Sequence, residues 1–316
     1  MMKRILIVVA LLLFPVSATA WNDRGHMTVA YIAYQQLSQP LRDRVDTLLK
    51  RNPQYSSWIA GVPAADRKLA AFLKAATWPD CIKQELRCPG YKEDGSNGGE
   101  VAPPEPEASR NIGYTDKDMH KYWHFINQPF SSSGIPTVPP QKANVVREIS
   151  ILTAAIESAE SESIKSYDLV WLEHLVGDIH QPLHAMERFT KSHPNGDAGG
   201  NLVKFCSKPC TDNLHSYWDG IFGTETKLSS IKALGNELLM KGKPQGANIT
   251  NIQTWATESF ELGKTLVYVS PISSDVNGQL SPRPNAQYEA KAQKTAERQV
   301  LLAGYRLAAL LTAHLK

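Results

Sequence analysis

Residues 171–184, WLEHLVGDIHQPLH, place three histidines and an aspartate in an apolar, core-like frame. Buried groups of this kind are costly unless they are hydrogen-bonded, paired with an opposite charge or bound to a metal. His174 and Asp178 are four residues apart, so on a helix they share one face and could bind one metal ion. His215 and Asp219 repeat this spacing in NLHSYWDG. Two such pairs indicate a metal site more strongly than either pair alone.

Two further histidines of the same stretch differ in their expected orientation. On an ideal helix His180 lies about 240° around the axis from His174, so we expect it to face away from the metal site. His184 lies about 80° from the ligand face if the helix stays regular. Pro182 cannot donate a hydrogen bond to the carbonyl of Asp178, which predicts a kink that turns His184 toward the site.

Three other segments carry groups of the same chemistry. Asp80 ends TWPD, and His124 lies between aromatic residues in YWHFIN. Taken alone, each is better explained by an ordinary role, as a capping or turn aspartate and as a core histidine bonded to the backbone. Trp21 and His26 lie in WNDRGH. A free α-amine at Trp21 would be a competent metal ligand, because its pKa of about 8 leaves part of it neutral.

That free amine requires the removal of residues 1–20, which have the layout of a secretory signal peptide. A short basic start precedes an apolar run, 5–14, and the small residues ATA at 18–20 form a cleavage site before Trp21. The apolar run is shorter than the about 20 residues that span a membrane. We therefore predict an exported chain, 21–316, that is periplasmic or secreted. An uncleaved N-terminal anchor is the alternative.

Composition excludes a strongly basic protein that coats nucleic acid. The formal charge is +3, and it falls to +1 when Lys3 and Arg4 leave with the signal peptide. Any binding of polyanions must then depend on positive charge that is local to one site.

The cysteines form two close pairs in loop-like sequence, Cys81 with Cys88 and Cys206 with Cys210. In an exported protein disulfides are expected, and four cysteines allow three connectivities. Local pairing, 81–88 and 206–210, is the favoured one. The alternative is a structural zinc held by all four thiolates, although neither pair has the C-x-x-C spacing typical of such sites.

Helical periodicity runs through most of the chain, whereas alternating β-branched runs are scarce. The predicted helical segments are 26–37, 41–50, 64–76, 142–161, 166–188, 227–241, 250–263 and 286–315. Long connections at 88–118, 127–141 and 189–213 separate them, and loops of this length are usually functional or disordered. Without an internal repeat or a break in composition, we predict one all-α domain over 21–316.

In this order along the chain, the candidate ligands resemble those of the zinc-dependent single-strand nucleases and 3′-nucleotidases of the S1/P1 type. The resemblance implies a mostly helical fold with three zinc ions in a cleft. The nine matching positions are Trp21, His26, Asp80, His124, His174, Asp178, His184, His215 and Asp219. All of them precede residue 220, so the C-terminal third is expected to be scaffold.

The resemblance also implies how the zinc ions are shared. One ion would be held by Asp80, His124, His174 and Asp178. A second, close to the first, would be held by His184, His215 and Asp219. The third would take the amine and carbonyl of Trp21 together with His26, and Asp178 would bridge it to the first ion.

Four more residues match family positions that contact the substrate. Lys83 matches a basic position near the scissile phosphate, and Asn201 in GGN matches a residue that contacts the phosphate. Phe125 and Asn127 match positions that stack on a base and read its edge. Asn127 departs from the aspartate common in the fungal enzymes, and an amide donates as well as accepts hydrogen bonds. Base preference is therefore not carried over.

The implied activity is hydrolysis of single-stranded RNA and DNA to 5′-nucleotides, with 3′-nucleotides as further substrates and a monomer as the favoured state. A zinc-dependent phospholipase C is one alternative, although that enzyme typically has Glu where this chain has Asp219 and a longer gap between the N-terminal Trp and the first His. The other alternative is a secreted metal-binding protein without catalytic activity.

Overall fold

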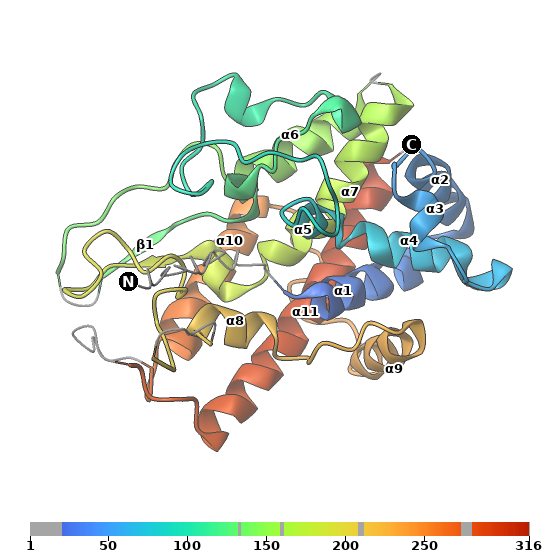
Figure 1. The fold of residues 1–316 in the computed structure, drawn as a ribbon. Helices are drawn as coiled ribbons and strands as arrows, with labels where there is room; N and C mark the ends of the chain where they lie inside the picture. The colour runs from blue at the N-terminus through green and yellow to red at the C-terminus, as the bar shows by residue number, and fades with distance from the viewer. Residues whose placement is uncertain (1–20, 132–133, 159–160, 208–211, 273–279, 316) are drawn as a thin grey trace, which may run out of the picture.

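Helices form most of the molecule in the computed structural model, which describes residues 21–131, 134–158, 161–207, 212–272 and 280–315 (Figure 1). The predicted signal peptide lies outside the described residues. The α-helices are α1 (Asp23–Gln36), α2 (Gln39–Leu49), α3 (Tyr55–Trp58), α4 (Arg67–Ala75), α5 (Trp78–Cys81), α6 (Val145–Glu157), α7 (Glu162–Asp178), α8 (Leu214–Asp219), α9 (Leu228–Leu239), α10 (Ile252–Leu262) and α11 (Ala286–His314).

Shorter elements connect these helices. Single turns are η1 (Ala64–Asp66), η2 (Glu107–Ser109), η3 (Gly113–Thr115), η4 (Lys121–His124) and η5 (Pro182–Ala185), and η6 (Gly263–Val267) is a π-helical turn after α10. Among the described residues the strands are β1 (Pro129–Phe130) and β2 (Glu187–Arg188), which pair in parallel. The predicted all-α class is therefore confirmed.

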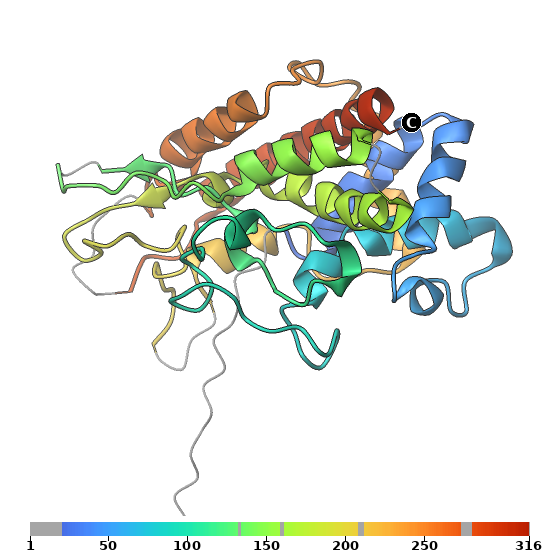
Figure 2. The same ribbon diagram turned by 90° about the horizontal axis from the view of Figure 1, so that it is seen from above.

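The main core lies around α7, which α6 follows along its length, and around α1 and α11, which pack against each other (Figure 2). Close approach of α1 and α11 depends on Gly304, where an added Cβ would lie 2.4 Å from a methyl group of Ile32. The α7 helix is buried over most of its length, from Ser166 to Asp178. Its apolar sequence on all sides follows from this central position.

The predicted helix over 166–188 does not continue with a kink; it ends. The α7 helix stops at Asp178, and Pro182 begins the separate turn η5. Gln181 precedes the proline and has φ −86° and ψ 117°, the extended conformation that a following proline imposes. Its side-chain oxygen accepts a hydrogen bond from Leu183 N at 2.6 Å and so caps η5. His184 therefore owes its direction to a new turn and not to a bent helix.

A smaller core lies beside the first and includes residues of η5, α8, the start of α11 and the 203–205 segment. Trp218 and Leu214 of α8 pack there, together with Tyr268 and Tyr288. The candidate metal ligands occur on elements of both cores, which places them where the two cores meet.

The Cys81–Cys88 disulfide is present, with an S–S distance of 2.08 Å. A zinc ion held by all four thiolates is therefore wrong, because two of the thiols are oxidised. Of the second predicted pair, Cys206–Cys210, Cys210 lies outside the described residues.

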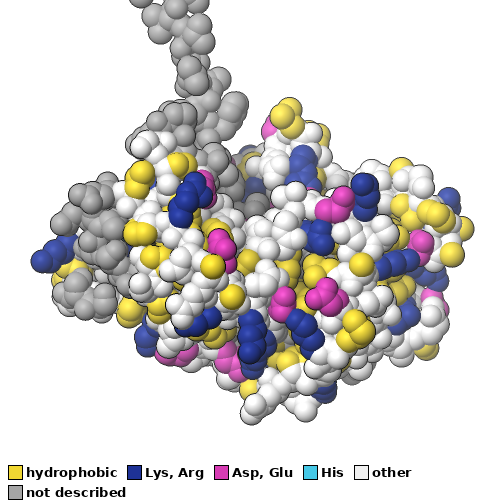
Figure 3. Space-filling view, turned by 90° about the horizontal axis from the view of Figure 1, so that it is seen from below, with side chains coloured by type: hydrophobic (Ala, Val, Ile, Leu, Met, Phe, Trp, Pro, Cys, Tyr) yellow, Lys and Arg dark blue, Asp and Glu magenta, His cyan; other side chains and the backbone are white. Residues whose placement is uncertain are grey.

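On the surface, Lys and Arg side chains are interspersed with Asp and Glu over the face drawn in Figure 3. This agrees with the near-neutral formal charge. Within the described part of the chain, no helix combines the length and apolarity needed to cross a membrane.

Candidate metal centre

Eight buried histidines and aspartates, each at most 5 % exposed, converge from six elements. Their ligand atoms form three groups in which each side chain could contact a common ion. The groups are His26, His174 and Asp178; Asp80, His124 and His174; and His184, His215 and Asp219. Apart from the helical pairs His174 with Asp178 and His215 with Asp219, these residues are far apart in the sequence, and the fold brings them together.

Asp178 lies at the middle of the first two groups. Its Oδ2 is 2.9 Å from His124 Nδ1 and 3.3 Å from His174 Nε2, and its Oδ1 is 3.3 Å from His26 Nε2. The second carboxylate, Asp80 Oδ1, lies 3.6 Å from His174 Nε2 and 3.9 Å from His124 Nδ1. The two oxygens of Asp178 thus face different histidines, the geometry that lets one carboxylate serve two ions.

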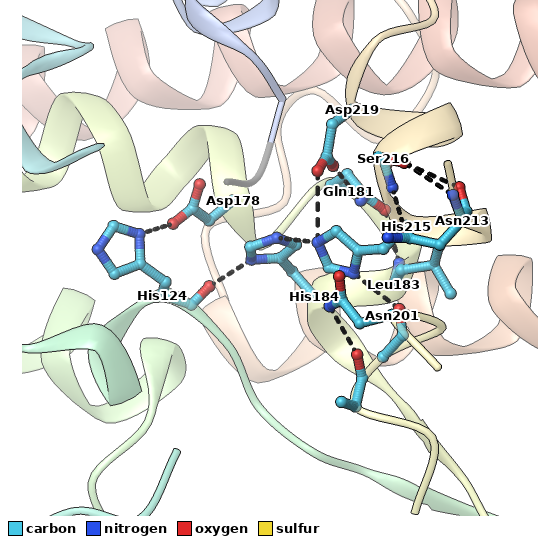
Figure 4. Close-up of polar contacts among 12 residues, drawn as sticks. His124, Asp178, Gln181, Leu183, His184, Asn201, Asn213, His215, Ser216 and Asp219 are labelled. Atoms are coloured by element: carbon cyan, nitrogen blue, oxygen red, sulfur yellow. Dashed lines mark hydrogen bonds and ion pairs between the residues drawn. The ribbon is translucent and has the colours of Figure 1, made fainter. Parts of the chain in front are cut away.

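The third group comes from η5 and α8 (Figure 4). His184 Nε2 lies 3.0 Å from His215 Nε2, and His215 Nε2 lies 3.5 Å from Asp219 Oδ2. The other oxygen of Asp219 accepts a 2.7 Å hydrogen bond from Gln181 Nε2. Asn213 caps α8 by accepting from Ser216 N, so the four-residue spacing of His215 and Asp219 falls on one helical turn.

Backbone carbonyls fix the orientation of three of these imidazoles. In each, Nδ1 lies 2.7 Å from a carbonyl oxygen, which requires a proton on Nδ1 and, in the neutral ring, leaves the lone pair on Nε2. The three pairs are His174 with Ala76 O, His184 with His124 O, and His215 with Gly199 O. Metal-bound histidines have this outer bond almost always, and it aims the free nitrogen at the ion.

The imidazoles of His184 and His215 are arranged as ligands of a bound cation would be. Burial lowers the pKa of His184, and burial together with His184 lowers the pKa of His215 to about 3, so both rings are neutral near neutral pH. Two neutral Nε2 atoms 3.0 Å apart then present lone pairs to each other, with no proton between them. Such a contact is repulsive unless a positive ion lies beside both atoms.

The start of the described chain lies against the same centre. Trp21 is fully buried, and Asn22 N donates a 3.1 Å hydrogen bond to the carbonyl of Asp219. His26 packs directly on α7 at Gly177, where an added Cβ would lie 2.8 Å from His26 Nδ1. Any larger residue at position 177 would displace this imidazole.

Lys83 and Asn201, the residues expected near phosphate, lie beside different groups. Lys83 Nζ is 2.5 Å from Asp80 Oδ1, and the lysine side chain is 2 % exposed. Asn201 is half-buried, and its Nδ2 donates a 2.8 Å hydrogen bond to Ala198 O. Its turn also carries Gly199, whose carbonyl orients His215.

Phe125 and Asn127 follow His124 directly and are both half-buried. The segment between them is fixed to η5, because Ile126 N donates a 2.8 Å hydrogen bond to His184 O. Phe125 also accepts at its carbonyl from Val145 N, at the start of α6. This double attachment holds the two predicted base-contacting residues next to the ligand groups.

His180 lies outside the three groups. Its Nδ1 donates a 2.7 Å hydrogen bond to Val176 O, and its Nε2 accepts from Arg306 Nη1 at 2.9 Å. Both ring nitrogens are therefore used, one by a carbonyl near the end of α7 and the other by Arg306 of α11. The expectation that His180 faces away from the ligands matches this placement.

Sequence reasoning missed the residues that orient the ligands. Gln181, which holds Asp219, lies within the HQPLH segment but carries no chemistry of its own to mark it. The carbonyls of Ala76, His124 and Gly199 are backbone groups, so side-chain identity gives no signal for them.

Comparison with known proteins gives one family. The model of the S1/P1 nuclease family matches residues 21–316. Nuclease S1 of Aspergillus oryzae is 25 % identical over 329 residues, covering 92 % of this chain and 90 % of that protein. Nuclease P1 of Penicillium citrinum is 25 % identical over 307 residues, covering 91 % and 95 %. Endonuclease 3 of Arabidopsis thaliana is 28 % identical over 263 residues, covering 78 % and 70 %.

Proposed function

The chain belongs to the S1/P1 nuclease family and is thus a phosphoester hydrolase, and from this premise we propose its substrates and its metal. It is an exported zinc-dependent phosphodiesterase that cleaves single-stranded RNA and DNA to 5′-nucleotides, and it also removes phosphate from 3′-nucleotides. The observation that supports metal dependence most strongly is the 3.0 Å contact between the Nε2 atoms of His184 and His215. Export is supported by the family match, which begins at Trp21, the residue that the predicted cleavage would expose.

Three zinc ions are proposed, and each has a set of residues to hold it. Asp80, His124, His174 and Asp178 would hold the first, and His184, His215 and Asp219 would hold the second. The amine and carbonyl of Trp21 would hold the third, with His26 and Asp178. Imidazole nitrogens and carboxylate oxygens are the ligands that zinc prefers alongside thiolates.

When bound, zinc would supply Lewis acidity toward the phosphate and lower the pKa of coordinated water to about 7. The chain's own residues position the substrate. The ammonium of Lys83 and the amide of Asn201 would bind the non-bridging phosphate oxygens. The Phe125 ring would stack on an unpaired base, which favours single strands because a base in a duplex is already stacked. Asn127 would contact the edge of that base.

The test uses the 21–316 chain with its metal content determined on the same sample. We expect release of 5′-mononucleotides from single-stranded RNA and DNA, slower cleavage of duplex DNA, and about three zinc ions per chain. A chelator should abolish the activity and added zinc should restore it. A zinc-replete chain that cleaves no nucleic acid and no 3′-nucleotide would contradict the proposal. Phosphatidylcholine would then be the next substrate, and a chain inactive on that too would be a silent metal-binding protein.

A further inference from the structure

We propose that Asp197 is a positioning residue for the metal centre. Its carboxylate shapes the turn 197–201, which supplies the Gly199 carbonyl that orients His215 and also carries Asn201. The inference rests on the proposed zinc centre, since it assigns a residue that prepares one of its ligands.

The carboxylate of Asp197 is fully buried, and both of its oxygens accept hydrogen bonds. Oδ1 accepts from the backbone N–H of Arg188 at 3.2 Å and of Gly200 at 3.1 Å. Oδ2 accepts from the Tyr268 hydroxyl at 2.7 Å and lies 3.3 Å from Arg188 Nε. A buried carboxylate needs such partners to offset its loss of hydration. Here the partners come from three separate segments, at Arg188, Gly200 and Tyr268, and the single carboxylate connects them.

The turn that Asp197 joins has an unusual backbone. Ala198, Gly199 and Gly200 have φ values of 51°, 54° and 85°, so three consecutive residues are left-handed. The alanine is costly in this region, and such conformations persist only where the surroundings impose them. At Gly199 an added Cβ would lie 2.6 Å from Leu183 O, so the turn is pressed against η5.

Neighbouring side chains support the same turn. Glu187 Oε1 accepts a 2.7 Å hydrogen bond from Ala198 N, and the Arg188 guanidinium lies 4.1 Å from the centre of the Tyr268 ring. Tyr268 directly follows the π-helical turn η6, and such turns are frequent at functional sites. The C-terminal third, expected to be scaffold, thus contacts the turn 197–201 through Tyr268.

Removing the charge of Asp197 changes the hydrogen bonding at one of its two oxygen positions. In Asp197→Asn, one acceptor oxygen becomes an NH₂ group that faces donors, so either the Tyr268 hydroxyl or the Gly200 N–H loses its acceptor. The turn can then relax, and Gly199 O no longer holds the Nδ1 proton of His215 in place. Outer partners of metal-bound histidines typically contribute about 10–100-fold to metal affinity. We expect that loss at the group formed by His184, His215 and Asp219.

The experiment compares Asp197→Asn and Tyr268→Phe with a matched control, Asp46→Asn, all in the 21–316 chain. Asp46 is also a buried aspartate; it accepts from the Tyr55 hydroxyl at 2.9 Å and pairs with Lys50 Nζ at 2.7 Å, but it lies on α2 in none of the three ligand groups. Zinc affinity is measured by competition with a chromophoric chelator. Zinc stoichiometry, the melting temperature, and kcat and KM for a 3′-nucleotide are measured on the same samples.

In Asp197→Asn we expect one zinc ion to bind about 10–100-fold more weakly, with kcat reduced and KM changed little, and in Tyr268→Phe a loss of a few fold. Asp46→Asn should lower the melting temperature without changing zinc affinity. Zinc affinity equal to that of the wild type in both Asp197→Asn and Tyr268→Phe would overturn the inference. So would a loss of zinc in Asp46→Asn as large as in Asp197→Asn. If Asp197→Asn fails to fold, Tyr268→Phe decides. If the wild-type chain binds zinc but cleaves no phosphate ester, zinc affinity still tests Asp197 separately from the proposed activity.

Discussion

Two histidine–aspartate clusters contain residues only four positions apart, His120 and His124, and they differ in how their imidazoles are bonded. One is the candidate metal centre, to which His124 belongs. The other consists of His120 with Asp94, Asp116 and Asp118, and ligand atoms of Asp94, Asp118 and His120 lie close enough together to hold one ion. Residue types and distances alone do not separate the two clusters.

The partners of both ring nitrogens show the difference, as a comparison of His120 with His215 makes clear. In His120, Nδ1 lies 3.2 Å from Asp94 Oδ2 and Nε2 lies 3.3 Å from Asp116 Oδ2, so both nitrogens meet carboxylates. Burial disfavours the charged ring, but these two contacts outweigh burial and raise its pKa to about 9. His215 instead meets a carbonyl on one side and another histidine on the other, and its pKa is about 3.

The His120 cluster therefore balances its charge with the chain's own cations. The imidazolium stacks on Trp123 at 3.8 Å between ring centres, and Arg110 Nη2 lies 2.6 Å from Asp118 Oδ2. Its role is to attach the long 88–118 loop to η4, since Asp94 also accepts from His120 N and from the Tyr122 hydroxyl. A histidine between two carboxylates is therefore held as an ion pair, whereas one whose Nδ1 lies on a carbonyl can bind a metal through Nε2 only where, unlike in His180, no cation already occupies Nε2.

The largest expected effect is at Asp178. Asp178→Asn removes the carboxylate that faces His26, His124 and His174, so we expect loss of zinc and a fall in activity of more than about 100-fold. Asp116→Asn is the matched change in the His120 cluster and should keep its zinc. Zinc analysis and nuclease assays on both proteins measure the contrast. An active, zinc-replete Asp178→Asn chain would show that the centre is misplaced.

A retained N-terminal leader should have the next largest effect. With residues 1–20 attached, the nitrogen of Trp21 is an amide and can no longer act as an amine ligand, so we expect about one zinc ion fewer per chain and reduced activity. The His120 cluster should not respond, because it does not involve the N-terminus. Equal zinc content and activity with the leader retained would refute the proposed role of Trp21.

The His120 cluster should show its own pH dependence. The pKa of His120 is about 9 in the folded chain and about 6.5 in the unfolded chain. Its contribution to the free energy of unfolding is therefore complete below pH about 6.5 and is lost as the pH rises through about 9. We expect wild type to exceed His120→Gln by an extra 2–3 kcal/mol or so, on the order of the pKa shift, at pH 6 relative to pH 9.5. Parallel stability curves for the two proteins would contradict the imidazolium assignment.

The smallest expected effect concerns His180, which belongs to neither cluster. His180→Ala removes one of the two acceptors near Arg306 Nη1, the other being Glu258 Oε2 at 2.7 Å, and should cost about 1–3 kcal/mol, seen as a fall of a few degrees in the melting temperature. Zinc stoichiometry should stay unchanged. Loss of zinc in this variant would mean that His180, just after the end of α7, is coupled to the metal centre more closely than the contacts indicate.

The parts of the centre that depend on local periodicity could be predicted from the sequence. His174 and Asp178 lie on one face of α7 because helical spacing is set within a few residues. His184 was predicted near them for the wrong reason, since proline ended the helix and did not bend it. The extended conformation imposed on Gln181 by the proline was the signal that could have shown this.

The rest could not be predicted from local patterns because it depends on distant segments. Gly199 orients His215 across 16 residues, and Ala76 orients His174 across 98. Whether His120 or His124 faces carboxylates on both sides is decided by how the 88–118 loop packs, and no periodic pattern specifies that loop. Resemblance to a family supplied the ligand order, whereas physical reasoning from the sequence supplied only the helical pairs.

The Cys81–Cys88 disulfide lies next to the candidate metal centre and would form in an oxidising compartment. The bond begins at the residue after Asp80 and closes the loop that contains Lys83. In a reducing cytosol this loop lacks its covalent closure, because disulfides persist mainly in oxidising compartments. If the chain cleaves single-stranded RNA as proposed, its activity endangers the cell that makes it. Because the disulfide lies next to the candidate metal ligand Asp80 and the proposed phosphate contact Lys83, its oxidation would delay completion of the site until after the proposed export.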